Sequence, residues 1–195
     1  KEKYLALDVA KRLRRHLQAD GIKVVMTRES DRFIPLSGRP AIANRLRANL
    51  FVSVHINANR SRKISGIEVY YPRVSVAPHA QWPPAVEASE IGVPSTAVKQ
   101  TLWDLVLGRT RSSSRKLALT LCRSMRQGLQ THCRGAKPAK FVVLREAWMP
   151  AVLIEVGYVS NEEEARRLSR ADYREAAAQS MAQGIVAHLR ETQAI

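Results

Sequence analysis

Two nearly continuous apolar runs constrain the fold of this chain more than any other feature of its sequence. Residues Leu50–Ile56 are apolar apart from Ser53 and His55, and residues Ala151–Val156 are apolar apart from Glu155. Runs without regular polar alternation are typical of strands buried on both faces of a parallel sheet. Such a sheet needs a covering of helices, so the two runs favour an α/β fold.

Helical and strand-like patterns alternate along the rest of the 195 residues. Apolar residues at helical spacing predict helices over residues 2–19, 36–49 and 115–129, and from residue 162 to the C-terminus. Shorter apolar runs predict further strands over residues 22–26, 66–71 and 141–144. We therefore expect one α/β domain, with a mostly parallel twisted sheet and helices on both faces, in three layers.

Residues 72–111 interrupt this alternation, because they are rich in proline and show no convincing period. We interpret them as an insertion in the domain. Residues 112–114 are three consecutive serines, which are candidates for the N-cap of the helix that follows. No apolar run approaches the roughly 18 to 20 residues that a membrane-spanning helix needs.

The charge of the chain favours an anionic partner. Thirty-two Lys and Arg residues against 17 Asp and Glu residues give a formal net charge of +15. Nucleic acid, an anionic membrane surface and an acidic cell-wall polymer all fit this charge. The arginines are spread over several helix faces, and no nucleic-acid-binding motif accompanies them, so we expect no specific nucleic-acid partner.

The two cysteines, Cys122 and Cys133, do not form a metal-binding pair. Cys122 lies on an apolar helical face, which favours a buried free thiol. A disulfide between the two cysteines would require an oxidising compartment, and their spacing does not test it.

Three polar residues stand where ligands bind in α/β proteins, near the carboxyl ends of strands or at a helix start. Burial in its apolar strand should raise the pKa of Glu155, which suits a general base, although an ion pair with Arg145 is an equal alternative. His55 closes the first buried run, where a histidine is either a ligand or a satisfied core residue. Glu2 opens the first helix, where the helix dipole alone would favour a carboxylate.

Four separated segments together resemble one enzyme family. They are residues 1–13 (KEKYLALDVAKRL), 24–59 (VVMTRESDRFIPLSGRPAIANRLRANLFVSVHINAN), 66–71 (GIEVYY) and 149–168 (MPAVLIEVGYVSNEEEARRL). In this order they resemble the zinc-dependent N-acetylmuramoyl-L-alanine amidases of the type 3 family, and in particular its division-associated branch. These enzymes remove stem peptides from peptidoglycan. The resemblance implies a zinc-exopeptidase-like fold.

The resemblance implies a role for each candidate residue. Glu2, in the Glu-Lys pair at the helix start, and His55, in Ser-Val-His-Ile-Asn, would be zinc ligands. Glu155 would be the catalytic glutamate, and Asn57 would bind substrate. The implied reaction is hydrolysis of the amide bond between N-acetylmuramic acid and L-alanine, with zinc acidifying the attacking water.

The chain departs from the family pattern at one ligand. The family's first zinc histidine lies in a Gly-His-Gly motif upstream of the Glu-Lys helix, and this sequence begins at that helix. None of the other histidines, His16, His79, His132 and His188, has a suitable context to replace it. We therefore interpret residues 1–195 as an N-terminally truncated catalytic domain that binds zinc weakly and is inactive in this form.

In the division-associated branch, a segment after the GIEVYY-like strand covers the zinc until an activator displaces it. The insertion at 72–111 occupies the same place, so Glu87 or Glu90 could supply an autoinhibitory carboxylate and an activator protein could relieve it. The alternative is a surface excursion that docks Trp103 and Leu107 on the core.

Three functional hypotheses follow. The first is a monomeric zinc amidase that acts on peptidoglycan in the periplasm or outside the cell, in wall remodelling and daughter-cell separation. The second is a non-catalytic basic domain that binds wall or nucleic acid. The third is another zinc peptidase on a similar sheet.

Overall fold

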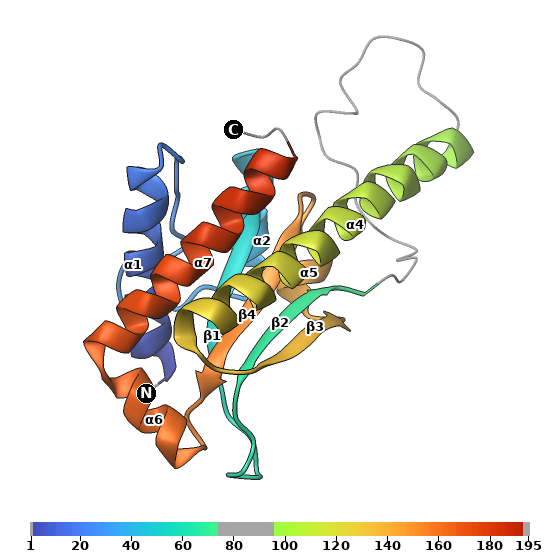
Figure 1. Cartoon of the computed structure of the whole chain (residues 1–195). Coiled ribbons are helices and arrows are strands. Elements are labelled where there is room, and N and C mark those ends of the chain that lie inside the picture. The colour runs from blue at the N-terminus through green and yellow to red at the C-terminus, as the bar shows by residue number, and fades with distance from the viewer. Residues whose placement is uncertain (1, 74–95, 193–195) are drawn as a thin grey trace.

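The computed structural model describes residues 2–73 and 96–192, with side chains described for residues 2–73 and 108–192 (Figure 1). Helices and strands alternate along these residues, as the sequence predicts. In chain order the elements are α1 (Glu2–Ala19), α2 (Gly38–Arg45), β1 (Phe51–Asn57), β2 (Ile67–Pro72), α4 (Thr96–Leu129), β3 (Cys133–Ala139), α5 (Val142–Arg145), β4 (Ala151–Tyr158), α6 (Glu162–Ser169) and α7 (Ala171–Glu191).

The four described strands form one mixed sheet in the order β1-β4-β2-β3. The pairs β1–β4 and β2–β3 are parallel, and β2–β4 is antiparallel. Helices α1, α4 and α7 cover one face of the sheet, and α2 and α5 lie on the other (Figure 1). The predicted α/β fold, with a mostly parallel sheet between two helical layers, is confirmed.

Each face of the sheet has its own hydrophobic core, because successive residues of a strand point to opposite faces. Val152 and Ile154 of β4 contribute to the core beneath α1, α4 and α7. Ala151 and Leu153 contribute to the smaller core beneath α2 and α5. Glu155 is two residues beyond Leu153, so its side chain points to the face of α2 and α5.

Helix α1 holds its position through both apolar and ionic contacts. Its buried residues, Ala6, Val9, Leu13 and Leu17, recur at helical spacing, as predicted. On the flank of the helix, Asp8 accepts a hydrogen bond from Arg174 of α7 (2.5 Å), and His16 contacts Glu175 (2.8 Å). These contacts, in the middle and near the C-terminal end of α1, orient the helix that carries Glu2 in its first turn.

Helix α4 is much longer than the predicted helix over 115–129, because it starts at Thr96 inside the expected insertion. The prediction that residues 112–114 cap this helix is wrong. Ser114 is fully buried within α4, where its hydroxyl donates to the carbonyl of Thr110 (2.7 Å) and accepts from the amide of Ala151 (2.9 Å). A serine can bond back to the preceding helical turn, so it fits inside a helix as well as at a cap. Glu87 and Glu90 lie outside the described residues.

The side chains of Trp103 and Leu107 lie outside the described part of the chain, so the proposed docking of these two residues on the core is untested.

Two predicted strands are wrong. Ile22 and Val24 are partly buried against the core while their neighbours are exposed, but residues 22–26 pair with no described strand. Residues 141–144 belong largely to the short helix α5, which buries Val143 and Leu144. A short apolar run does not distinguish a strand from a buried helical turn, because periodicity needs more residues.

Strand β3 has no counterpart among the predictions, because its sequence is polar and contains Pro138. Proline removes a ladder donor and is tolerated mainly at sheet edges, which is where β3 lies. Its first residue, Cys133, forms a disulfide with Cys122 of α4, with Cα atoms 5.7 Å apart. The interpretation of Cys122 as a free thiol is therefore wrong.

Close packing of α4 against α7 yields a first prediction. A Cβ atom on Gly128 would lie 2.6 Å from the Cβ of Ser180, whereas one on Gly108, also in α4, would meet nothing within 4 Å. Gly128→Ala should therefore lower the free energy of unfolding by about 1–3 kcal/mol, measured by denaturant titration. Gly108→Ala is the matched control and should raise it by up to about 1 kcal/mol. Equal effects of the two substitutions would contradict the described helix contact.

Candidate metal and catalytic site

Charged residues from three adjacent strands stand side by side on the face of the sheet that carries α2 and α5. Glu155 of β4 is in register with His55 of β1 on one side and with Glu68 of β2 on the other. Residues in register on neighbouring strands have their Cβ atoms about 4.5–5.5 Å apart. We call His55, Glu155 and Glu68, together with Glu2, the polar band.

Glu155 is the most strongly perturbed member of the polar band. Its Oε2 is buried and has no hydrogen-bond partner among the described residues. Burial first, and then the negative charges of Glu2 and Glu68, raise the pKa of Glu155 to about 8. Arg145, the ion-pair partner considered from the sequence, contacts Glu146 instead (3.3 Å).

Glu2 and His55 converge although they lie 53 residues apart in the sequence. The first turn of α1 brings Glu2 Oε1 to 3.1 Å from His55 Nδ1. The other ring nitrogen, His55 Nε2, lies 3.1 Å from the hydroxyl oxygen of Ser53. Half of the Glu2 side chain is exposed, so the contact is at the edge of the molecule and open to a ligand.

Glu68 is the functional candidate that the sequence reasoning missed. It is 3% exposed, and it accepts hydrogen bonds from Tyr70 (2.5 Å), Arg134 (3.1 Å) and Lys137 (2.5 Å). Burial opposes ionisation of Glu68, but the bonds from Lys137, Tyr70 and Tyr158 outweigh it and lower the pKa to about 2. The sequence contains a signal for it, because Glu68 interrupts an apolar strand in the same way as Glu155.

Asn57 lies at the end of β1, where the backbone pairs with β4. Its side-chain oxygen accepts a hydrogen bond from the amide of Ala58 (2.8 Å), and its carbonyl accepts from the amide of Val159 (2.9 Å). Asn57 therefore shapes the turn that follows His55. A role in binding substrate stays a prediction.

Glu2 and His55 are the donors that suit zinc best by their chemistry. Zinc binds imidazole nitrogen and carboxylate oxygen, and these two groups meet beside the unpartnered oxygen of Glu155. Within residues 2–73 and 96–192 there is no group of three or more His, Cys, Asp or Glu residues arranged to hold a metal ion. Of the other described histidines, His16 contacts Glu175 and His188 contacts Ser113.

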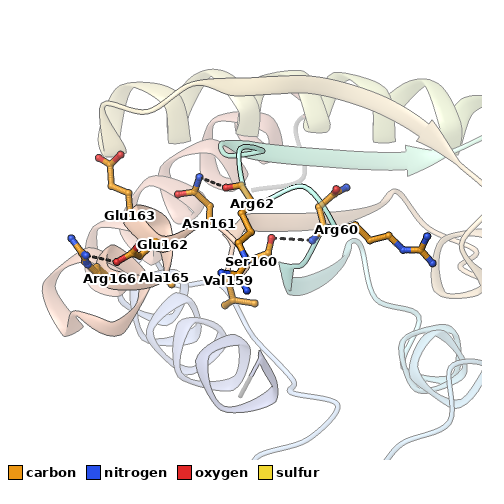
Figure 2. Close-up of a pocket in the computed structure, with 10 residues that line it drawn as sticks. Arg60, Arg62, Val159, Ser160, Asn161, Glu162, Glu163, Ala165 and Arg166 are labelled. Carbon is orange, nitrogen blue, oxygen red and sulfur yellow. Dashed lines mark hydrogen bonds and ion pairs between the residues drawn. The ribbon is translucent and has the colours of Figure 1, made fainter.

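A pocket of about 1020 Å³ lies just beyond the ends of β1 and β4 (Figure 2). It is formed by the loop after β1, the turn after β4 and the first turns of α6. The two loops are joined where Ser160 Oγ accepts from the amide of Asn59 (3.0 Å) and where Asn161 donates to the carbonyl of Arg62 (2.9 Å). None of the polar band residues lines this pocket.

Together these features define a class of protein, an α/β domain whose candidate site lies toward the carboxyl ends of the parallel strands β1 and β4. The family model for N-acetylmuramoyl-L-alanine amidases (Amidase_3) matches residues 1–187, and the chain belongs to this family. The resemblance seen in the four sequence segments is thus confirmed.

Individual relatives agree with this assignment. The chain is 34% identical over 96% of its length to N-acetylmuramoyl-L-alanine amidase AmiC of Escherichia coli O6:H1, and 32% identical over 96% to AmiA of E. coli K12. It spans 47% of AmiC and 68% of AmiA. The catalytic domain of the amidase CwlV from Bacillus (Paenibacillus) polymyxa superimposes with a TM-score of 0.75 at 30% identity, covering 97% of this chain and 86% of CwlV.

The surroundings of Glu155 yield a second prediction. In the metal-free protein its carboxyl group should titrate near pH 8, because burial and two neighbouring carboxylates disfavour its charge. Carbon-detected NMR of the glutamate side chains measures this pKa. Glu2→Gln removes one of the negative charges and should lower it. An ordinary value near 4.5 in the folded protein would contradict the described burial.

The same shift has a consequence for stability. Between about pH 4.5 and pH 8 the folded protein holds a proton on Glu155 that the unfolded chain has lost, so the free energy of unfolding should fall as pH rises. Glu155→Gln should flatten this part of the pH profile.

Proposed function

We propose that this chain is the catalytic part of a zinc-dependent amidase that hydrolyses the bond between N-acetylmuramic acid and L-alanine in peptidoglycan. Family membership and the amidase relatives support the reaction class. The observation that carries the proposal is the buried, unpartnered Oε2 of Glu155, a residue in register with His55, whose ring Glu2 contacts.

In this proposal, Glu2 and His55 hold the zinc ion. A zinc ion at that position supplies Lewis acidity, which polarises the scissile carbonyl and acidifies the attacking water. Ser53 restrains the second nitrogen of His55, so that Nδ1 faces Glu2. Contacts of this kind orient a metal-binding histidine and fix its tautomer.

Glu155 acts as the general base and then as the acid. Its raised pKa lies close to neutral pH, where a group both accepts a proton from water and returns it to the leaving amine of L-alanine. Glu68 stays ionised beside it because of its own hydrogen bonds. The two carboxylates therefore have different roles. Glu155 transfers protons, and Glu68 stays ionised and hydrogen-bonded.

The surface charge suits the proposed substrate. A net charge of +15 attracts the chain to anionic wall polymers. No helix in the described residues is long and apolar enough to cross a membrane. We propose that the protein works as a monomer in the periplasm or outside the cell, in wall remodelling and cell separation, and that an activator relieves a block in which Glu87 or Glu90 of the insertion takes part.

Mutation of the base tests the proposed reaction. In the full-length protein with zinc supplied, Glu155→Gln should lower the rate of peptide release from muropeptides by about 10²–10⁴-fold, because proton transfer is lost while the shape is kept. Mass spectrometry of the products should show peptides with a free N-terminal L-alanine. Glu29→Gln, which changes an exposed carboxylate away from the site and the pocket, is the control and should leave the rate unchanged. Undiminished release by Glu155→Gln would refute the assignment, and products cleaved elsewhere would indicate a different peptidase.

Zinc binding tests the ligand pair separately. Isothermal titration with zinc should show weak binding to the 195-residue chain, because two protein donors hold the ion less firmly than three. Glu2→Gln and His55→Ala should each weaken it further. His132→Ala, outside the site, should have no effect. Tight stoichiometric binding, or binding that survives loss of His55, would overturn the assignment.

A further inference from the structure

Two cations from the edge strand β3 converge on one oxygen of Glu68. Arg134 Nε lies 3.1 Å and Lys137 Nζ 2.5 Å from Glu68 Oε1. The other oxygen, Oε2, accepts from the hydroxyl of Tyr70 (2.5 Å). Gly135, which has a positive φ of 105°, lies between the two cations in β3. The register between β2 and β3 shifts between Ile67 and Val69 of β2. This irregularity lets both side chains reach the same carboxylate.

The two cations carry more charge than Glu68 needs. One carboxylate balances one cation, so the group of Glu68, Arg134 and Lys137 has a surplus of one positive charge. Glu68 has only 4% of its side chain exposed, whereas Arg134 has 34% and Lys137 has 41% exposed. The cations therefore present their surplus charge to solvent. Each also keeps N–H donors beyond the one used on Glu68.

The position of the pair relative to Glu155 indicates what it could bind. In the sheet order, β3 is two strands away from β4, which corresponds to about 9–10 Å. An extended peptide advances about 3.3–3.6 Å per residue. A carboxylate one or two residues beyond L-alanine lies two or three residues from the cleaved bond, and with the reach of the long cationic side chains this matches the distance.

We propose that Arg134 and Lys137 form a subsite for a carboxylate of the stem peptide, one or two residues beyond L-alanine. This rests on the proposed amidase function and adds to it a basis for substrate choice. Glu68 has a positioning role: it holds both cations in place while their outer donors bind the peptide. Charge-assisted hydrogen bonds of this kind recognise carboxylates strongly, particularly with arginine.

A purely structural role makes a different prediction. If the cations served only to neutralise buried Glu68, replacing one would change stability and would not change the preference between substrates. Single substitutions keep the fold testable, because the remaining cation still balances Glu68. Circular dichroism and the unfolding midpoint of each variant check that it folds.

The test compares two muropeptides that differ at one group, a free carboxylate or a carboxamide on the residue after L-alanine. Binding to the 195-residue chain is measured by titration calorimetry, and release of peptide is measured separately with the full-length protein and zinc. We expect the carboxylate form to bind about tenfold more tightly. Lys137→Gln and Arg134→Gln should each remove most of this preference, and Lys137→Arg should retain it. Lys140→Gln, just beyond β3 and exposed, is the matched control and should keep the preference intact.

Equal affinity of the wild-type chain for both muropeptides, or binding of neither, would overturn the subsite. So would a preference that survives loss of Arg134 and of Lys137. The two proposals fail separately. Peptide release without discrimination refutes the subsite and leaves the amidase proposal standing, whereas discrimination in binding without any release refutes the amidase activity and leaves the subsite standing.

Discussion

The site depends on how two buried carboxylates on neighbouring strands are balanced. Glu155 and Glu68 face each other across the antiparallel pair β4–β2. Like charges this close in a buried place do not both ionise freely. Two cations and tyrosine hydroxyls keep Glu68 ionised, while Glu155 has an oxygen without a partner and a pKa raised to about 8. The asymmetry of their partners holds Glu68 ionised and leaves Glu155 with an unpartnered oxygen, which suits the proton transfer that we propose for it.

The helices position the residues that we propose as zinc ligands. Helix α1 packs against α7 through apolar residues and through the ion pairs of Asp8 and Glu175, and its first turn delivers Glu2 to His55. Glu2 also adds its charge to the field that raises the pKa of Glu155. At the other edge of the sheet, the disulfide between Cys122 and Cys133 joins α4 to the start of β3, next to Arg134. Both edges of the sheet are therefore attached to helices on the face opposite to Glu155 and Glu68.

Much of this arrangement could be predicted from local pattern. The first helix, the strands around His55 and Glu155, and the helices after residue 162 have regular, sufficiently long patterns, and they were located correctly. The strand over 22–26 and the strand over 141–144 were wrong, because short apolar runs reveal neither a ladder partner nor a helical turn. Strand β3 was missed because its stabilisation comes from pairing and from contact with Glu68, and its own residues are polar.

By itself the sequence determined the fold class, the family and the candidate pair His55 and Glu155, since buried strands and helix faces are encoded in local periodicity and four motifs occur in order. Only the tertiary structure decided which charges meet. It brought Glu2 to His55, placed Glu68 opposite Glu155, and gathered Arg134 and Lys137 on Glu68. The reason is physical: strand order and register set these distances, and they depend on pairing between segments far apart in the chain.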